Sequence, residues 1–225
     1  MIDSNTLITG SFIALFILVI VGLIFFNKFP QEKYFKYFAF FSLFFLTGEI
    51  LRTFIVIISD LFSIVIANTL MVSGIIFLYI GVRAMLNLES QWRTRYYIPI
   101  AMVFFGFILF TYVHYNATMR ILIFSAFSII YASSISWIFL KNATKEFKVF
   151  DYISSLLFLV GVIIFFVRTL KASMMEINLI YPNSTDLLNT FIYAYLLFMS
   201  YWLSIILIIQ AIRLFKNKNY INLEK

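Results

Sequence analysis

The stretch LITGSFIALFILVIVGLIFF, residues 7–26, decides the fold of this chain, because it carries no charged residue along its whole length. A helix of about 20 apolar residues spans the hydrocarbon core of a bilayer. Further apolar stretches follow at residues 34–58, 61–85, 97–114, 119–140, 152–172 and 187–214. Lipid offers peptide groups no hydrogen-bond partners, and these stretches lack the alternation of barrel strands. The sequence therefore predicts one all-α domain, residues 1–225, built as a polytopic bundle of seven transmembrane helices.

The composition excludes several classes of protein. Hydrophobic residues make up 63% of the chain and charged residues 12%, about half the charged share of a soluble domain. There is no cysteine, which excludes disulfides, thiolate metal sites and cysteine nucleophiles. A single histidine among scattered carboxylates argues against a structural zinc site. We therefore expect neither a metal nor a cofactor.

The basic residues predict the orientation. Of the 17 lysines and arginines, 13 fall on the connections after helices 1, 3 and 5 and on the tail after helix 7. The positive-inside rule then places the N-terminus outside and the C-terminus, with a short basic tail at residues 215–225, in the cytoplasm. The net charge of +7 is accordingly interpreted as a topology signal with anionic membrane lipid as its partner, and not as a nucleic-acid footprint.

Small residues recur at helical spacing in two of the predicted helices. Such stripes allow close helix packing, either within the bundle or in a homodimer. We expect the two helices that carry them to form the bundle centre. The stripes consist of Ala67, Gly74 and Gly81 in the third helix and Ser128, Ala132 and Ser136 in the fifth.

Charged side chains within the predicted spans are the first candidates for function, because they are costly in lipid and commonly mark functional sites. Glu49 and Arg52 lie one turn apart near the outer end of the second helix. They either neutralise each other as a local ion pair or contact a ligand.

Arg120, Arg168 and Asn68 are predicted in the same outer leaflet. Arg120 either extends its charge to the interface or joins Arg52 and Arg168 in receiving an anion. Asn68 either contacts a ligand or bonds a neighbouring helix. The outer layer is also compatible with a neutral salt-bridge network, since four acids balance four bases there. These are Glu49, Asp60, Glu176 and Asp186 against Arg52, Arg120, Arg168 and Lys171.

Catalytic motifs are missing from the sequence. The last predicted span contains no lysine for a retinal Schiff base before Lys216. No phosphate loop, HExxH zinc motif or Gly-x-Ser-x-Gly elbow occurs. We therefore expect a protein that is not an enzyme.

Residues 38–172 resemble the N-terminal seven-helix sensory segment that precedes GGDEF diguanylate cyclase domains in bacteria. The resemblance rests on GEILR at 48–52, LFSIVIAN at 61–68, Gly74, LYIGVR at 78–83, RILI at 120–123 and VRTL at 167–170. The chain departs from the family pattern at Ser59 and Asp60, where proline is frequent, and at 84–87, where a basic residue and glycine usually follow. It contains no GGDEF domain, so we expect a free-standing sensor or the input part of a longer protein.

The resemblance implies a multi-pass sensor of the bacterial inner membrane. A small ligand would bind in an outer-leaflet pocket lined by Arg52, Asn68 and Arg168. The seventh helix would then pass the signal to a cytoplasmic signalling enzyme or output domain. The alternatives are a small-solute transporter, which would need polar residues from face to face, and a non-catalytic membrane scaffold.

Overall fold

The computed structural model describes residues 4–88, 96–143, 148–174 and 187–223, and those residues form helices and turns without any strand. Two π-helical segments join the α-helices: η1 (Leu61–Ile66) leads into α3, and η3 (Leu109–Val113) continues α4. The α-helices are α1 (Ser4–Lys28), α2 (Lys33–Thr53), α3 (Ala67–Met85), α4 (Tyr97–Ile108), α5 (Ala117–Lys141), α6 (Lys148–Met174) and α7 (Leu187–Leu223).

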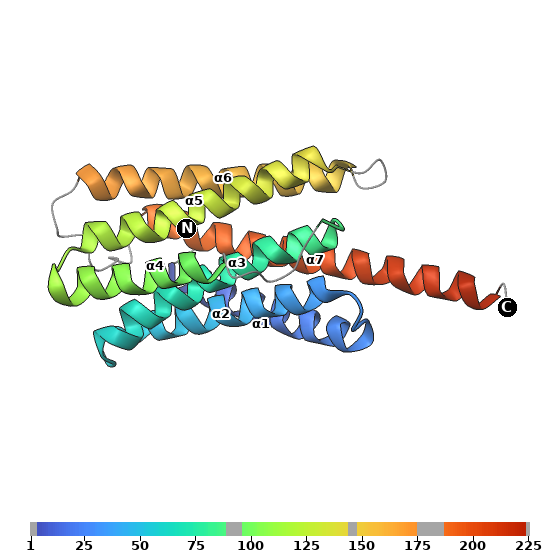
Figure 1. Cartoon of the computed structure of the whole chain (residues 1–225), viewed down its shortest axis with the longest axis horizontal. Coiled ribbons are helices and arrows are strands. Elements are labelled where there is room, and N and C mark those ends of the chain that lie inside the picture. Colours follow the sequence, from blue (N-terminus) through green and yellow to red (C-terminus); the bar gives the residue numbers. More distant parts are fainter. Residues whose placement is uncertain (1–3, 89–95, 144–147, 175–186, 224–225) are drawn as a thin grey trace.

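Consecutive helices run in opposite directions, so the bundle has two ends (Figure 1). We call the end at which α2 finishes and η1 begins the Asp60 end, and the end at which α3 finishes the Met85 end. The last turns of α7 project beyond the Met85 end (Figure 1). The short connection between α2 and η1 makes α2 and α3 antiparallel neighbours.

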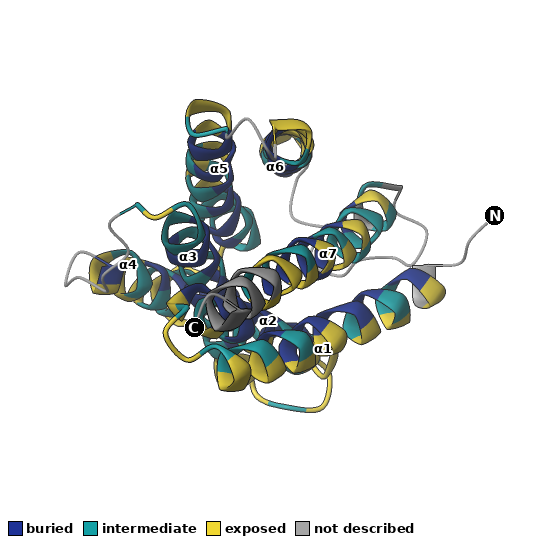
Figure 2. Cartoon of the chain, turned by 90° about the vertical axis from the view of Figure 1, so that its right-hand side faces the viewer, coloured by how far each residue is buried: buried dark blue, intermediate teal, exposed yellow. Residues whose placement is uncertain are grey.

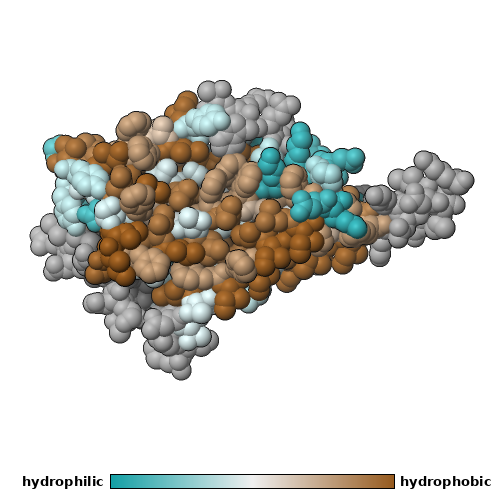
Figure 3. All heavy atoms as spheres, turned by 90° about the horizontal axis from the view of Figure 1, so that it is seen from below, coloured by the Kyte–Doolittle hydropathy of each residue, from teal (hydrophilic) through white to brown (hydrophobic). Residues whose placement is uncertain are grey.

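Among the described residues, six helices are long and apolar enough to cross a membrane, which makes the chain a multi-pass membrane protein. Hydrophobic residues dominate the face shown in Figure 3, and hydrophilic ones gather toward the end from which α7 projects. The fourth predicted span, now Tyr97–Val113, is shorter. At 1.5 Å per residue it covers about 25 Å, less than the ~30 Å hydrocarbon core. The ring of Tyr96, the residue before α4, lies 6.4 Å from the ring of Tyr79. Tyr79 lies more than one turn before the end of α3, so α4 begins deeper in the bundle than the point at which α3 ends.

The glycine stripe of α3 packs within the bundle. A Cβ on Gly74 would lie 2.9 Å from the Phe41 carbonyl oxygen, and one on Gly48 would lie 2.6 Å from the Ala67 carbonyl oxygen. The backbones of α2 and α3 therefore approach as closely as glycine permits. α3 lies among α2, α4, α5 and α7 (Figure 2), which agrees with its predicted central position. The same prediction is wrong for α5, which lies at the outer side of the bundle and packs mainly on α6.

The serine stripe of α5 faces α6. Ser136 Oγ lies 3.0 Å from the Ser155 carbonyl oxygen and 2.8 Å from Ser155 Oγ, and both residues are buried. Ser128 and Ala132 are buried on the same helix. Both small-residue stripes are thus occupied by contacts within this chain, as the packing interpretation predicts.

Two helix ends differ from the sequence prediction. α2 ends at Thr53 and not at residue 58, because the chain turns there through i to i−3 backbone bonds. α7 continues to Leu223 and not to 214, so the predicted tail at 215–225 is helical as far as Leu223. Hydropathy falls after Leu214, but no glycine or proline follows to end the helix.

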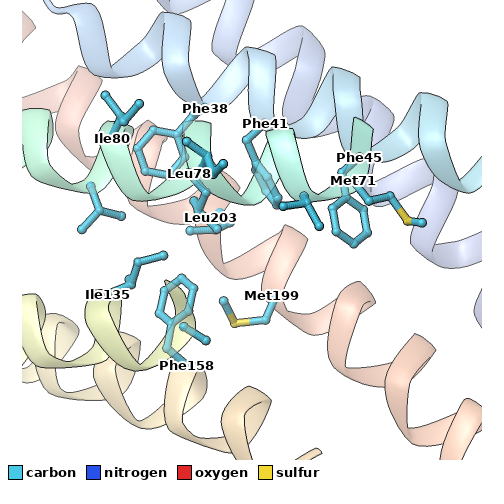
Figure 4. Packing of buried hydrophobic residues seen from close by; sticks show 14 of the residues in the cluster. Phe38, Phe41, Phe45, Met71, Leu78, Ile80, Ile135, Phe158, Met199 and Leu203 are labelled. Atoms are coloured by element: carbon cyan, nitrogen blue, oxygen red, sulfur yellow. The ribbon is translucent and has the colours of Figure 1, made fainter. Parts of the chain in front are cut away.

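The hydrophobic core joins α2 and α3 to α5 and α6 through α7. Phe38 of α2 and Leu78 of α3 lie on one side of α7, and Ile135 of α5 and Phe158 of α6 lie on the other side (Figure 4). Leu203 of α7 lies between them and is 1% exposed. Long apolar and aromatic side chains therefore fill the interior between the two ends of the bundle.

Candidate functional site

The last turn of α2 places two opposite charges on one helical face at the Asp60 end. Arg52 Nη2 lies 2.8 Å from Glu49 Oε2. The Glu49 side chain is 5% exposed and that of Arg52 is 28% exposed. The Glu49 carboxylate therefore requires a partner in place of water, and Arg52 supplies it. The local ion pair predicted from the i, i+3 spacing is confirmed.

α7 contributes a hydroxyl to this pair. Arg52 Nη2 also donates a hydrogen bond to Tyr193 Oη at 2.8 Å. The Arg52 guanidinium carbon lies 6.0 Å from the centre of the Tyr193 ring. Nothing in the sequence distinguishes Tyr193 from Tyr195, so this partner of Arg52 was not predicted. The two tyrosines face different helices, because two residues turn an α-helix by about 200°.

Tyr195 points to α6. A Cβ on Gly161 of α6 would overlap the Tyr195 hydroxyl, so this glycine permits the close approach of the two helices. α7 is thus connected to α2 through Tyr193 and to α6 through Tyr195, at neighbouring levels of the bundle.

Arg168 of α6 completes the arrangement. Its guanidinium carbon lies 5.6 Å from the centre of the Phe124 ring on α5. It interacts electrostatically with Arg52, Glu49 and Tyr193, although it has no hydrogen-bond partner among the described residues. We call Glu49, Arg52, Arg168 and Tyr193 the Arg52 cluster. With two guanidinium groups and one carboxylate, the cluster carries a net charge of +1.

The described contacts of Arg120 are with residues outside the Arg52 cluster. It is 6% exposed, at the beginning of α5. Its Nη1 lies 3.5 Å from Thr111 Oγ1 of η3, and its guanidinium carbon lies 5.0 Å from the centre of the Tyr115 ring. The prediction that Arg120 extends to the interface is therefore wrong, because hydroxyl and aromatic partners hold it inside the bundle. Sequence reasoning identified neither Thr111 nor Tyr115.

Asn68 stands at the junction of η1 and α3 and is half-buried. Its Nδ2 donates to the Ile64 carbonyl oxygen at 2.6 Å, within the same helical segment. The described hydrogen bond of Asn68 thus links it to its own helical segment and not to the Arg52 cluster.

The acidic residues predicted in the outer layer besides Glu49 are Asp60, Glu176 and Asp186. Asp60 is exposed, and Glu176 and Asp186 lie outside the described residues. No group of three histidine, aspartate or glutamate side chains able to hold a metal ion occurs among the described residues.

The fold and the Arg52 cluster define a polytopic helical membrane protein with a buried ionic group at one end of the bundle. No protein family, no curated protein and no solved structure matches this chain. The resemblance to GGDEF-associated sensory segments accordingly stays a prediction.

Proposed function

We propose that this chain is a membrane-embedded sensory module that binds a small anionic ligand at the Arg52 cluster and signals through α7. In this proposal the Asp60 end lies in the outer leaflet of the bacterial inner membrane. The N-terminus is outside, seven segments cross the bilayer, and the C-terminus meets a cytoplasmic output domain or signalling enzyme. The charge asymmetry of the sequence supports this orientation.

The observation that carries the proposal is the second arginine of the cluster. Glu49 already compensates the charge of Arg52 at 2.8 Å, whereas Arg168 has no hydrogen-bond partner among the described residues. A guanidinium group offers five donors in a planar fork that matches a carboxylate or a phosphate. A ligand anion at Arg168 would satisfy these donors and compensate the net charge of the cluster.

The connection to α7 supports a signalling role. Arg52 holds Tyr193, so a ligand that draws Arg52 or Arg168 toward itself changes the contacts of α7 at the Asp60 end. α7 runs as one helix from there past the Met85 end. A ligand shifts such an arrangement only by binding one conformation better than the other. The packed apolar interior favours this mechanism over a polar path for solute transport.

Ligand-dependent thermal stabilisation of the full chain in detergent tests the proposal. We expect one or more of phosphate, acetate, succinate and glutamate to raise the melting temperature of the parent protein. Arg168→Gln should abolish the increase, and Arg52→Gln should reduce it. Arg83→Gln, which removes a half-buried arginine near the Met85 end, is the matched control and should retain it. An equal increase in the Arg168→Gln protein would refute the proposed site.

Two measurements separate the alternatives. Flux of the same anions into liposomes that contain the protein would identify a transporter. Reporter fusions at the two termini test the orientation, and reporters on the same side of the membrane would contradict the seven-span arrangement.

A further inference from the structure

A cavity of about 220 Å³ lies at the Met85 end, opposite the Arg52 cluster. It is formed where α3 and α5 end, where α6 begins and where α7 leaves the core. Its buried wall includes Phe139, Ile206, Asp151 and Ser154, whereas Arg213 on its rim is exposed. Four helices therefore enclose a space that is separate from the site proposed above.

The wall of this cavity is unusually polar for an apolar bundle. Ser154 Oγ donates to the Phe150 carbonyl oxygen at 2.8 Å and accepts from Trp202 Nε1 at 2.9 Å. Gln210 is half-buried and has no hydrogen-bond partner among the described residues. The polar groups of the cavity wall are one carboxylate, one guanidinium, three amides and one hydroxyl. They belong to Asp151, Arg213, Asn87, Asn142, Gln210 and Ser154. Such a wall suits a ligand that makes several hydrogen bonds.

The charges of the wall are ordered by depth. Asp151 is 6% exposed and lies in the first turn of α6, where the helix dipole stabilises its negative charge. The cavity also borders the C-terminal ends of α3 and α5, at Leu86 and Asn142, where the partial charge of a helix is negative. The exposed Arg213 supplies positive charge at the rim. A cationic group is therefore favoured inside and an anionic group outside.

We propose that this cavity binds a small zwitterion with a primary ammonium group. The ammonium donates to the Asp151 carboxylate, the anionic group meets Arg213, and Gln210 bonds the atoms between them. The volume is below the roughly 300–1,000 Å³ typical of sites for drug-sized ligands, so the bound group is small. Two sources share this chemistry: a soluble amino-phosphate or the headgroup of an ethanolamine phospholipid.

The emission of Trp202 provides a local readout, because its indole bonds Ser154 in the cavity wall. A full-length protein with Trp92→Phe and Trp137→Phe leaves Trp202 as its sole tryptophan. We expect millimolar phosphoethanolamine to shift this emission and to raise the melting temperature in phosphatidylcholine nanodiscs. Phosphocholine has the same charges but no ammonium hydrogen, and it should bind at least about tenfold more weakly. Equal binding of the two probes, or no response to phosphoethanolamine, would overturn the proposal.

The source of the ligand follows from a second comparison. If nanodiscs of phosphatidylethanolamine reproduce the Trp202 shift without any added probe, the ligand is a lipid headgroup. If only the soluble probe produces the shift, the ligand is a soluble zwitterion. Either result supports binding in the cavity.

Variants assign the contacts. Asp151→Asn should weaken phosphoethanolamine binding by at least about tenfold, because it removes the buried partner of the ammonium. Arg213→Gln alters an exposed side chain, so it tests the site even if Asp151→Asn does not fold. It should weaken binding of phosphoethanolamine and leave that of ethanolamine unchanged. Lys33→Gln removes an exposed positive charge at the same end of the bundle but outside the cavity wall, so it should retain the full response. A response lost in Lys33→Gln, or unchanged in Arg213→Gln, would refute the assignment.

Discussion

Replacing Gly48 by alanine should separate α2 from α3. The added Cβ would lie 2.6 Å from the Ala67 carbonyl oxygen and 2.6 Å from Met71 Cγ. Non-bonded carbon atoms are most stable at about 3.5–4.0 Å, and the carbonyl belongs to a helix backbone that cannot rotate away. Overpacking of this kind costs about 1–3 kcal/mol. Alanine also gains about 1 kcal/mol of helix propensity over glycine, so a matched glycine variant is needed to isolate the steric cost.

Gly10→Ala is that control. Gly10 is also in a long helix, but its added Cβ would lie 3.4 Å from the nearest atom, Leu197 Cδ1, which is ordinary contact. The propensity gain is common to both variants and cancels. The free energy of unfolding, measured by circular dichroism during SDS titration of mixed micelles, should be about 1–3 kcal/mol lower for Gly48→Ala than for Gly10→Ala. Equal stabilities would show that α2 and α3 do not approach through Gly48.

Three further contacts between helices are tested by the same unfolding measurement. A double-mutant cycle of Ser136→Ala and Ser155→Ala should give a coupling of about 0.6–1.7 kcal/mol, and additive effects would exclude the hydrogen bond between α5 and α6. Gly161→Ala should be about 1–3 kcal/mol less stable than Gly10→Ala, because its added Cβ overlaps the Tyr195 ring. Tyr195→Leu removes that ring and should restore part of the stability, and no recovery would contradict the approach of α6 to α7. Tyr193→Phe should cost about 0.6–1.7 kcal/mol by removing an acceptor of the α2 guanidinium, whereas unchanged stability would place that hydroxyl elsewhere.

The membrane class, the helix positions and the small-residue stripes followed from the sequence alone. Hydropathy is a property of each segment taken singly, so residues 61–85 were identifiable as a span without knowledge of their neighbours. Gly74 packs closely, as the small-residue stripe of the third predicted helix indicates, because close backbone approach requires a missing side chain. The pairing of Glu49 with Arg52 was also predictable, because their i, i+3 spacing on one helix by itself brings the two side chains together.

The contacts between helices were decided only by the tertiary structure. Nothing local indicated that Tyr193 would meet Arg52, that Arg120 would turn to η3, or that the ends of three helices and the side of α7 would form a polar cavity. These features depend on the rotation of each helix about its axis and on its depth relative to its neighbours. Packing across the whole bundle determines both quantities, whereas the apolar length of a segment depends on its own side chains alone.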